Sequence, residues 1–302
     1  MIQSIEVINH LGESLVLELR SPEKSGLLVR SITGITPTNA SVNVSEMATI
    51  DGGIVNSEVR TTYRNIVISL GFMFCPSIED SRLLTYRYFP VKRKLRLKIN
   101  TDKRSVYTEG YVESNEPDIF SSESSTQISI VCPDPNLYDI SLSTIIFSGR
   151  DPMFEFPFSN ESLTENLIEL SRKKEDYSET IQYSGDSDIG FIMTVHALGE
   201  ARNITIYNSE MREFTIINTD KIKTLTGIEF GSTDDLIISS IPGNRYVKLL
   251  RNGIYTNVLN CVDRTSDWLK LRKGLNTIAY TAEEGKENLE FKIEYRTAYE
   301  GV

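Results

Sequence analysis

The sequence predicts a mainly β protein of two domains. Its 302 residues include 33 isoleucines against 7 alanines, with 14 tyrosines and 12 phenylalanines. β-Branched and aromatic side chains favour a pleated, half-buried surface over a helix, so this composition excludes a helical bundle. Short apolar runs separated by turns point the same way and leave room for one or two short helices at most. The chain is longer than the roughly 100–200 residues of one ordinary domain, although all-β units of about 250 residues exist.

Residues 1–140 are expected to form a small β domain. Apolar side chains recur at strand spacing from residue 2 to 8 and from 15 to 19, and a further strand is expected over 65–72. Residues 31–60 differ, because turn-forming pairs such as Thr36-Pro37 and Asp51-Gly52 are separated by little apolar mass. This segment is predicted to be a long hairpin or arm that contacts a neighbour or extends into solvent.

The stretch from residue 94 to 99 alternates perfectly between basic and aliphatic side chains. Alternation places Lys94, Arg96 and Lys98 on one face of a strand and three aliphatic side chains on the other. A solvated strand face is the ordinary explanation for such a pattern. A face of one charge is also what an oligomer uses to meet an acidic neighbour, so these three residues are candidates for a subunit interface.

A second domain is expected after a boundary near residue 140, with the sandwich itself over 141–289. Residues 159–174 form the one segment with helical spacing, an early cap and late basic residues. Strands resume from 188 to 298 at intervals of 8–12 residues, which is typical of a β-sandwich. Asn252-Gly253, between two of these strands, is the strongest local hairpin signal in the chain.

Charge and cysteine usage exclude several classes of function. The net charge is −10, with −3 in residues 1–140 and −7 in the remainder, which argues against a protein that binds nucleic acid or anionic membranes. No run of 18 apolar residues is present, and neither membrane insertion nor a signal peptide is expected. Cys75, Cys132 and Cys261 are widely spaced and odd in number, so buried reduced thiols are favoured over disulfides or a zinc site.

The sequence carries no recognisable catalytic, cofactor-binding or metal-binding motif. Only His10 and His196 could shuttle protons near neutral pH, and a structural role is favoured for both. The carboxylate pairs that a glycosidase would need are all placed in turn-like segments, where acids ordinarily face water: Glu79-Asp80, Glu116 with Asp118, and Asp234-Asp235. Neither an enzyme nor a cofactor is therefore expected.

Several segments together resemble the distal tail protein family of tailed phages. They are Tyr63–Val67, Ile78–Arg82, Tyr88–Lys92, Thr101–Arg104, Glu109–Glu113, Glu116–Phe120, Cys132–Pro135, Gly274–Ile278 and Tyr295–Val302. The resemblance extends over nearly the whole chain and is densest at 60–135 and 265–302.

The resemblance implies a fold and an assembly. The N-terminal domain would be a split-barrel-like belt that closes into a homohexameric ring, joined by the terminal strand 290–302, and the second domain would be a galectin-like β-sandwich. The implied partners are the tail tube protein, the tape measure protein, the hub or tail-associated protein and a receptor-binding protein, with DNA passing through the channel without specific binding. The implied location is the virion tail tip or baseplate, and the host cytoplasm during assembly.

The resemblance implies a structural protein that connects the tail tube to the hub. Two other functions are alternatives to this role. One is a carbohydrate-binding module that recognises the host cell wall through the second domain, with Trp268, Tyr246 and Tyr255 as candidates to stack on a sugar ring. For Trp268, a place in the core beside a turn is the favoured alternative. The other is a wall-degrading enzyme that uses one of the carboxylate pairs.

Overall fold

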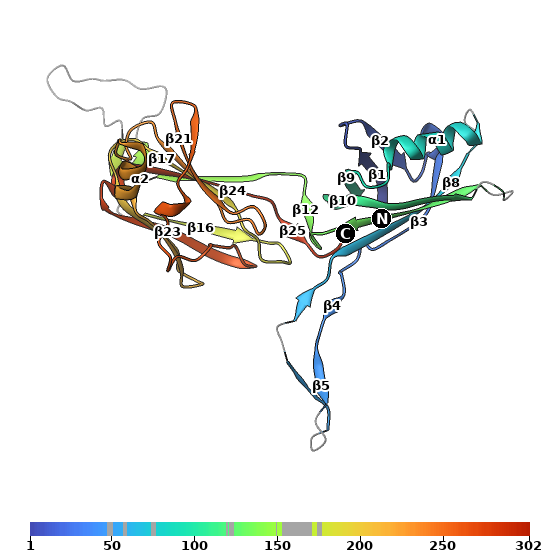
Figure 1. Ribbon diagram of the computed structural model, residues 1–302, viewed down its shortest axis with the longest axis horizontal. Helices are drawn as coiled ribbons and strands as arrows, with labels where there is room; N and C mark the ends of the chain where they lie inside the picture. Colours follow the sequence, from blue (N-terminus) through green and yellow to red (C-terminus); the bar gives the residue numbers. More distant parts are fainter. Residues whose placement is uncertain are drawn as a thin grey trace, which may run out of the picture. The chain divides into compact units, whose positions relative to one another are not determined.

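The computed structural model describes residues 1–46, 51–56, 59–73, 77–118, 120, 124–148, 150–152, 171–173 and 177–302. The chain divides into two compact units, one formed by Met1–Ile140 with Ala298–Val302 and the other by Ser141–Thr297. Strands dominate both units (Figure 1), which confirms the prediction of a mainly β fold.

The N-terminal unit is built on one antiparallel sheet. Its strands follow the order β2-β1-β9-β10-β11-β8-β3, and β12 pairs with both β10 and β25. The bounds are β1 (Ile2–Ile8), β2 (Ser14–Glu18), β3 (Leu27–Thr33), β8 (Arg64–Phe72), β9 (Lys94–Thr101), β10 (Ser105–Asp118), β11 (Ser125–Cys132), β12 (Leu137–Asp139) and β25 (Ala298–Tyr299). The strands predicted at 2–8, 15–19, 65–72 and 94–99 are confirmed.

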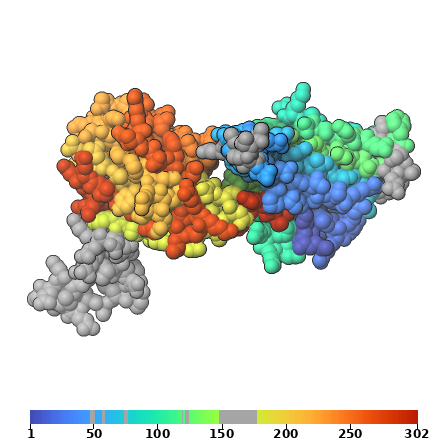
Figure 2. All heavy atoms as spheres, turned by 90° about the horizontal axis from the view of Figure 1, so that it is seen from below, coloured from blue at the N-terminus to red at the C-terminus, as the bar shows by residue number. Residues whose placement is uncertain are grey.

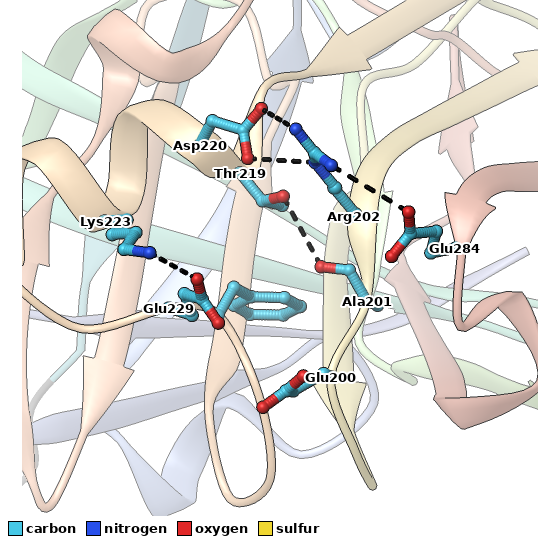
Figure 3. Close-up of a pocket in the computed structure, with 9 residues that line it drawn as sticks. Glu200, Ala201, Arg202, Thr219, Asp220, Lys223, Glu229 and Glu284 are labelled. Carbon is cyan, nitrogen blue, oxygen red and sulfur yellow. Dashed lines mark hydrogen bonds and ion pairs between the residues drawn. The ribbon is translucent and has the colours of Figure 1, made fainter.

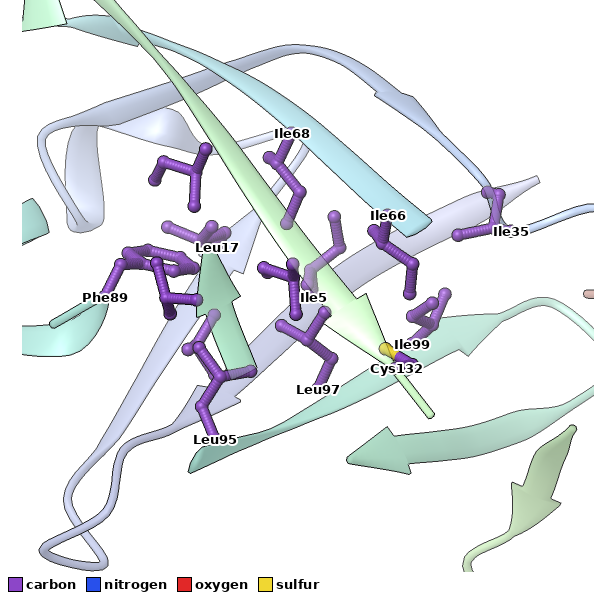
Figure 4. Close-up of a cluster of buried hydrophobic side chains, with 14 of the residues drawn as sticks. Ile5, Leu17, Ile35, Ile66, Ile68, Phe89, Leu95, Leu97, Ile99 and Cys132 are labelled. Carbon is purple, nitrogen blue, oxygen red and sulfur yellow. The ribbon is translucent and has the colours of Figure 1, made fainter. Parts of the chain in front are cut away.

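Alternating side chains turn one face of this sheet into the core of the unit. Ile5 lies opposite Ile99 and Val7 opposite Leu97, and all four are buried. The same face of the other strands contributes Ile66, Ile68, Ile128 and Ile130 to one apolar cluster (Figure 4). Period-two patterning therefore produced the core directly.

The predicted hairpin arm is confirmed for its described residues. β4 (Ala40–Ser41) pairs with β7 (Arg60–Thr61), and further out β5 (Val44–Glu46) pairs with β6 (Gly53–Val55). These short ladders leave the end of β3 and extend away from the sheet (Figure 1). We refer to residues 38–62 as the arm and to residues 34–37 as its root.

Helix α1 (Ile78–Tyr88) was not predicted from the sequence. It begins at Ser77, whose hydroxyl accepts a hydrogen bond from the backbone N–H of Asp80. Its fully buried residues are the polar Ser81 and Thr85, while Leu84 and Tyr88 pack partly buried against the core cluster, so only part of its inner face is apolar. Glu79 and Asp80 consequently occupy the first helical turn, where acids favour the helix dipole, and the turn-like setting predicted for them was wrong.

The second unit contains a six-stranded sheet, β13-β24-β17-β20-β21-β22, and a four-stranded sheet, β16-β23-β18-β19. Strands β14 and β15 form a separate two-stranded sheet. The rings of Tyr280 and Phe291, one from each large sheet, have centroids 4.0 Å apart, so the sheets pack as a sandwich. The bounds are β13 (Ser143–Ser148), β14 (Arg150–Pro152), β15 (Ser171–Lys173), β16 (Ser178–Tyr183), β17 (Ile192–Ala197), β18 (Arg202–Asn208), β19 (Glu213–Ile217), α2 (Thr219–Thr226), β20 (Asp235–Ser239), β21 (Tyr246–Arg251), β22 (Ile254–Asn257), β23 (Gly274–Glu284) and β24 (Leu289–Tyr295).

The Asn252-Gly253 hairpin is confirmed. Both residues have positive φ, 50° and 78°, which matches the turn that joins two right-twisted antiparallel strands. Arg251 and Ile254 face each other across the ladder on either side of it.

Two sequence predictions require correction or fall outside the description. Of the predicted helix at 159–174, residues 159–170 and 174 lie outside the described residues, and Ser171–Lys173 form strand β15. The prediction assigned too many C-terminal residues, 290–302, to the N-terminal domain. Strand β24 instead pairs with β13 and β17 in the second unit. Its residues Leu289, Phe291 and Ile293 are fully buried there, and only Ala298–Val302 returns.

Candidate interaction surfaces

Arg64 occupies the base of the arm and is 1% exposed. Its Nη1 donates to the backbone carbonyls of Gly34, at 2.5 Å, and Thr36, at 2.8 Å, both in the arm root. Nε donates to the carbonyl of Pro135 at 2.8 Å, and Nη2 to that of Glu300 at 2.7 Å. One guanidinium thus binds three segments that are remote in sequence, and we refer to Ala298–Val302 as the returning segment.

The electrostatic setting of Arg64 is unusual. Burial lowers the pKa of its guanidinium, and the nearby Asp134 opposes that shift. Arginine keeps its charge in proteins, and a buried charge is tolerated where its donors are satisfied. Carbonyl oxygens fill that role here, which makes the position intolerant of a side chain without the same planar fork.

The arm itself exposes apolar side chains. Val42, Val44, Ile54, Val55 and Val59 are between 47% and 55% exposed. Val44 and Val55 lie directly opposite each other in the ladder, so they share one face of the arm. A two-stranded hairpin is marginally stable alone in water, and exposed β-branched residues on one are typical of a surface that another chain covers.

The basic face of β9 carries its own counter-charges. Lys94 and Arg96 both contact Glu109 on β10, at 2.6 and 2.5 Å, and Lys98 contacts Glu6 on β1 at 3.0 Å. The Lys94 and Arg96 side chains hold the pKa of Glu109 below its usual value against the opposing effect of burial, which is the largest single influence. The role of these three cations at a subunit interface stays a prediction, and an acidic neighbour would have to compete with these glutamates.

The three aromatic candidates for sugar stacking do not form one platform. Tyr246 and Tyr255 share the outer face of the six-stranded sheet, where Tyr255 lies opposite Leu250, four residues beyond Tyr246. Trp268 lies beside Met193, Ile206 and Ile238, whose side chains turn toward the interior of the sandwich. Carbohydrate binding by these residues stays a prediction. So does the core position favoured for Trp268, whose side chain is half-buried with the Arg245 guanidinium over its ring.

The two remaining carboxylate pairs, Asp234-Asp235 and Glu116 with Asp118, differ in their surroundings. Asp234 is buried and binds Arg251. Asp235, at the start of β20, accepts a hydrogen bond from Nδ1 of His196 at 2.6 Å. Glu116 and Asp118 lie on β10 and not in a turn as predicted. Among the described residues, no group of three or more His, Cys, Asp or Glu side chains could hold a metal ion.

A polar hollow of about 370 Å³ in the second unit was not anticipated from the sequence (Figure 3). Arg202 binds the carboxylate of Asp220 through Nε and Nη2, both at 3.1 Å, and Lys223 binds Glu229 at 2.5 Å. The Arg202 guanidinium lowers the pKa of Asp220. Two of the four carboxylates that line the hollow, Glu200 and Glu284, are in excess of its two cations, so the hollow is acidic. Spacing in the sequence gave no signal because its residues come from separate segments of the chain.

The second unit matches a known protein family. Residues 184–299 match the family model described as siphovirus-type tail component, C-terminal domain. The second unit therefore carries the C-terminal domain of a siphovirus-type tail component. The resemblance identified from the sequence is confirmed.

The fold of the whole chain is similar to that of a solved structure. The SPP1 Dit (gp 19.1) protein, described as a paradigm of the hub adsorption apparatus in phages that infect Gram-positive hosts, matches with a TM-score of 0.65 and 11% identity, over 97% of this chain and 98% of that chain. A chain of the phage P2 baseplate in its activated conformation with Ca matches with a TM-score of 0.49 and 12% identity, over 100% of both chains. The sequence matches no curated protein. Within the described part of the tail component, no helix is long and apolar enough to cross a membrane.

Proposed function

We propose that this tail component forms a ring of six copies that connects the distal end of the tail tube to the hub of the tail tip. The observation that carries the proposal is the arm, which leaves the N-terminal sheet with five apolar side chains exposed. A closed ring of identical subunits needs a heterologous contact, in which one surface of a subunit meets a different surface of the next. An arm that meets the neighbouring copy satisfies that requirement.

The proposed partners follow from the place of such a ring. On one side it would meet the tail tube protein and the tape measure protein, and on the other the hub or tail-associated protein and a receptor-binding protein. DNA would pass through the channel without specific binding, in keeping with the net charge of −10 and with the pairing of the β9 cations to glutamates. The ring would assemble in the host cytoplasm. Its work is done by geometry and buried surface, and we propose no catalytic activity.

Mass photometry of the purified protein tests the ring. We expect a species of six subunits, or two such rings together, alongside monomer. The variant Val44→Lys with Ile54→Lys places charges on both faces of the arm and should shift the distribution strongly toward monomer. An interface of the ordinary size buries about 800 Å² per partner, and a buried unpaired charge weakens such a contact by several kcal/mol.

The matched control is Leu275→Lys. Leu275 is an exposed apolar residue on β23 of the second unit, so the control places a lysine on a surface to which the proposal assigns no ring contact. Rings that persist in the arm variant, or that are lost equally in the control, would contradict the role of the arm. If the unmodified protein were entirely monomeric, even when mixed with its tail tube protein, the ring would be contradicted.

The carbohydrate-binding alternative can be tested on the same preparation. Saturable binding to purified host cell wall that is lost in Tyr255→Ala would favour it, since Tyr255 is 62% exposed on the outer face of the sheet. Loss in Trp268→Ala alone would be less informative, because the half-buried Trp268 also lies against buried residues of the sandwich, and its removal could disturb the fold.

A further inference from the structure

The root of the arm lies between two other segments of the N-terminal unit. On one side a β-carbon on Gly34 would lie 1.9 Å from the carbonyl oxygen of Asn65, next to Arg64. On the other side the backbone N–H of Val302 donates to the carbonyl of Ile35 at 3.2 Å, and a β-carbon on Gly301 would lie 3.0 Å from Cδ of Pro37. Both approaches depend on the absence of a side chain, so the root fits closely against β8 and the returning segment.

Arg64, on β8, hydrogen-bonds to both the root and the returning segment. Its guanidinium binds the carbonyls of Gly34 and Thr36 in the root and that of Glu300 in the returning segment. Figure 2 shows the C-terminal residues, in red, beside the blue and green atoms of the N-terminal unit. Glu300 lies 236 positions from Arg64 in the sequence, and the guanidinium hydrogen-bonds to it as well as to the root.

The outer part of the arm has little means of setting its own direction. Its two ladders contain two and three residue pairs, and the apolar side chains on them are exposed rather than packed in a core. A short hairpin of this kind follows the conformation of the backbone from which it emerges. That conformation is the one in which Arg64 and the returning segment hold residues 34–37.

We propose that Arg64 is a positioning residue that couples the returning segment to the arm root and thereby fixes the direction of the arm. The returning segment then acts as a structural part of the arm's attachment, although it is far from the arm in sequence. The inference deepens the proposed function, in which the arm meets a second copy, and rests on it only for the consequence in assembly. The coupling itself can be observed in a single chain.

Amide hydrogen exchange of the full chain, measured by mass spectrometry at a concentration where the protein is monomeric, tests the coupling. In Arg64→Lys the point charge of lysine cannot reproduce the three-segment fork. We expect exchange in peptides covering residues 35–46 and 298–302 to accelerate at least about tenfold, since hydrogen bonds to a charged group are among the strong ones. Peptides from the core strands, 66–72 and 95–100, should keep their protection. Arg93→Lys is the matched control, because Arg93 is an exposed arginine of the same unit.

A second variant acts from the other side. Gly301→Val leaves Arg64 in place but pushes the returning segment away from Pro37. It should accelerate exchange in the same two peptides, and it decides the question should Arg64→Lys fail to fold. Exchange in residues 35–46 that stays within about twofold of the Arg93→Lys control in the folded variants would overturn the proposal, because loss of a hydrogen bond to a charged group should exceed that change.

Oligomer mass of the same variants, measured at a concentration where the unmodified protein forms rings, separates this inference from the proposed function. Accelerated exchange with rings still forming would retain the coupling and contradict the arm as the ring contact. Loss of rings with unchanged exchange would contradict the coupling. Accelerated exchange together with loss of rings supports both.

Discussion

The guanidinium of Arg251 donates hydrogen bonds to both carboxylate oxygens of Asp234 inside the second unit. Nε donates to Oδ1 at 2.7 Å and Nη2 to Oδ2 at 2.5 Å, with 17% of the arginine side chain and 4% of the aspartate side chain exposed. Nη2 also donates to the carbonyl of Glu229 at 2.7 Å. The pair fastens the end of β21 to the turn that precedes β20.

Removal of this arginine should therefore destabilise the sandwich severely. Arg251→Met leaves Asp234 as a buried charge without its cation, and we expect a loss of about 3–5 kcal/mol in the free energy of unfolding. Chemical denaturation followed by circular dichroism measures it. Adding Asp234→Asn should recover part of the loss by neutralising the stranded carboxylate. The control Arg202→Met removes an exposed partner of Asp220 and should cost far less. Equal losses in the two arginine variants would contradict this account.

Gly34 is required by a close approach and not only by its backbone angle. Its φ is +79°, and an added β-carbon would lie 1.9 Å from the carbonyl oxygen of Asn65. Gly34→Ala should lower the free energy of unfolding of the N-terminal unit by about 2–4 kcal/mol, combining backbone strain with displacement of β8. Gly12→Ala is the control, because Gly12 has φ +82° with no atom within 4 Å of the added carbon. It isolates the strain, at about 1 kcal/mol. A Gly34→Ala variant as stable as Gly12→Ala would refute the close approach.

Glu13 should make the N-terminal unit sensitive to acid. Hydrogen bonds from Arg87, and then from Asn9, lower the pKa of Glu13 from 4.5 to about 2. A depressed carboxylate pKa stabilises the fold at pH values above the ordinary pKa, and that stabilisation is lost as the pH falls through the folded value. Glu13→Gln should thus lower the melting temperature at pH 6, and the difference from the unmodified protein should shrink between pH 4.5 and 2.

Melting curves over this range, with Glu116→Gln as the control that removes one carboxylate elsewhere on the same unit, check the prediction. Direct titration of Glu13 by nuclear magnetic resonance provides the midpoint. A midpoint near the ordinary value of 4.5 would show that the Arg87 pair does not hold in solution.

The two described cysteines should be unreactive in the folded protein. Cys132 and Cys261 are fully buried, and burial raises the pKa of each thiol, which reduces the reactive thiolate. Cys75 lies outside the described residues, so the experiment uses a Cys75→Ser variant. We expect no labelling by a disulfide reagent at pH 8 without denaturant and complete labelling of both thiols after unfolding. Rapid labelling in native buffer would mean that one of the two units opens readily.

The sequence by itself determined the elements whose pattern is local. Strand β9 was readable because its period-two alternation puts three aliphatic side chains on one face, and the Asn252-Gly253 hairpin because its turn chemistry is confined to adjacent residues. The resemblance to a family was readable because the matching motifs are spread along the chain. Helix α1 escaped detection, since polar Ser81 and Thr85 share its inner face with Leu84 and Tyr88 and weaken the apolar period.

Only the tertiary structure decided which distant groups meet. Nothing in the residues around Arg64 shows that its donors are taken by carbonyls from Gly34, Pro135 and Glu300, because hydrogen bonds to backbone carbonyls carry no side-chain signature. The counter-charges of Lys94, Arg96 and Lys98 were hidden for a related reason: Glu6 and Glu109 become their neighbours through strand pairing, which depends on register across the sheet. Local periodicity specifies a strand and its buried face, whereas the partner of each polar side chain is chosen when strands from remote parts of the chain align.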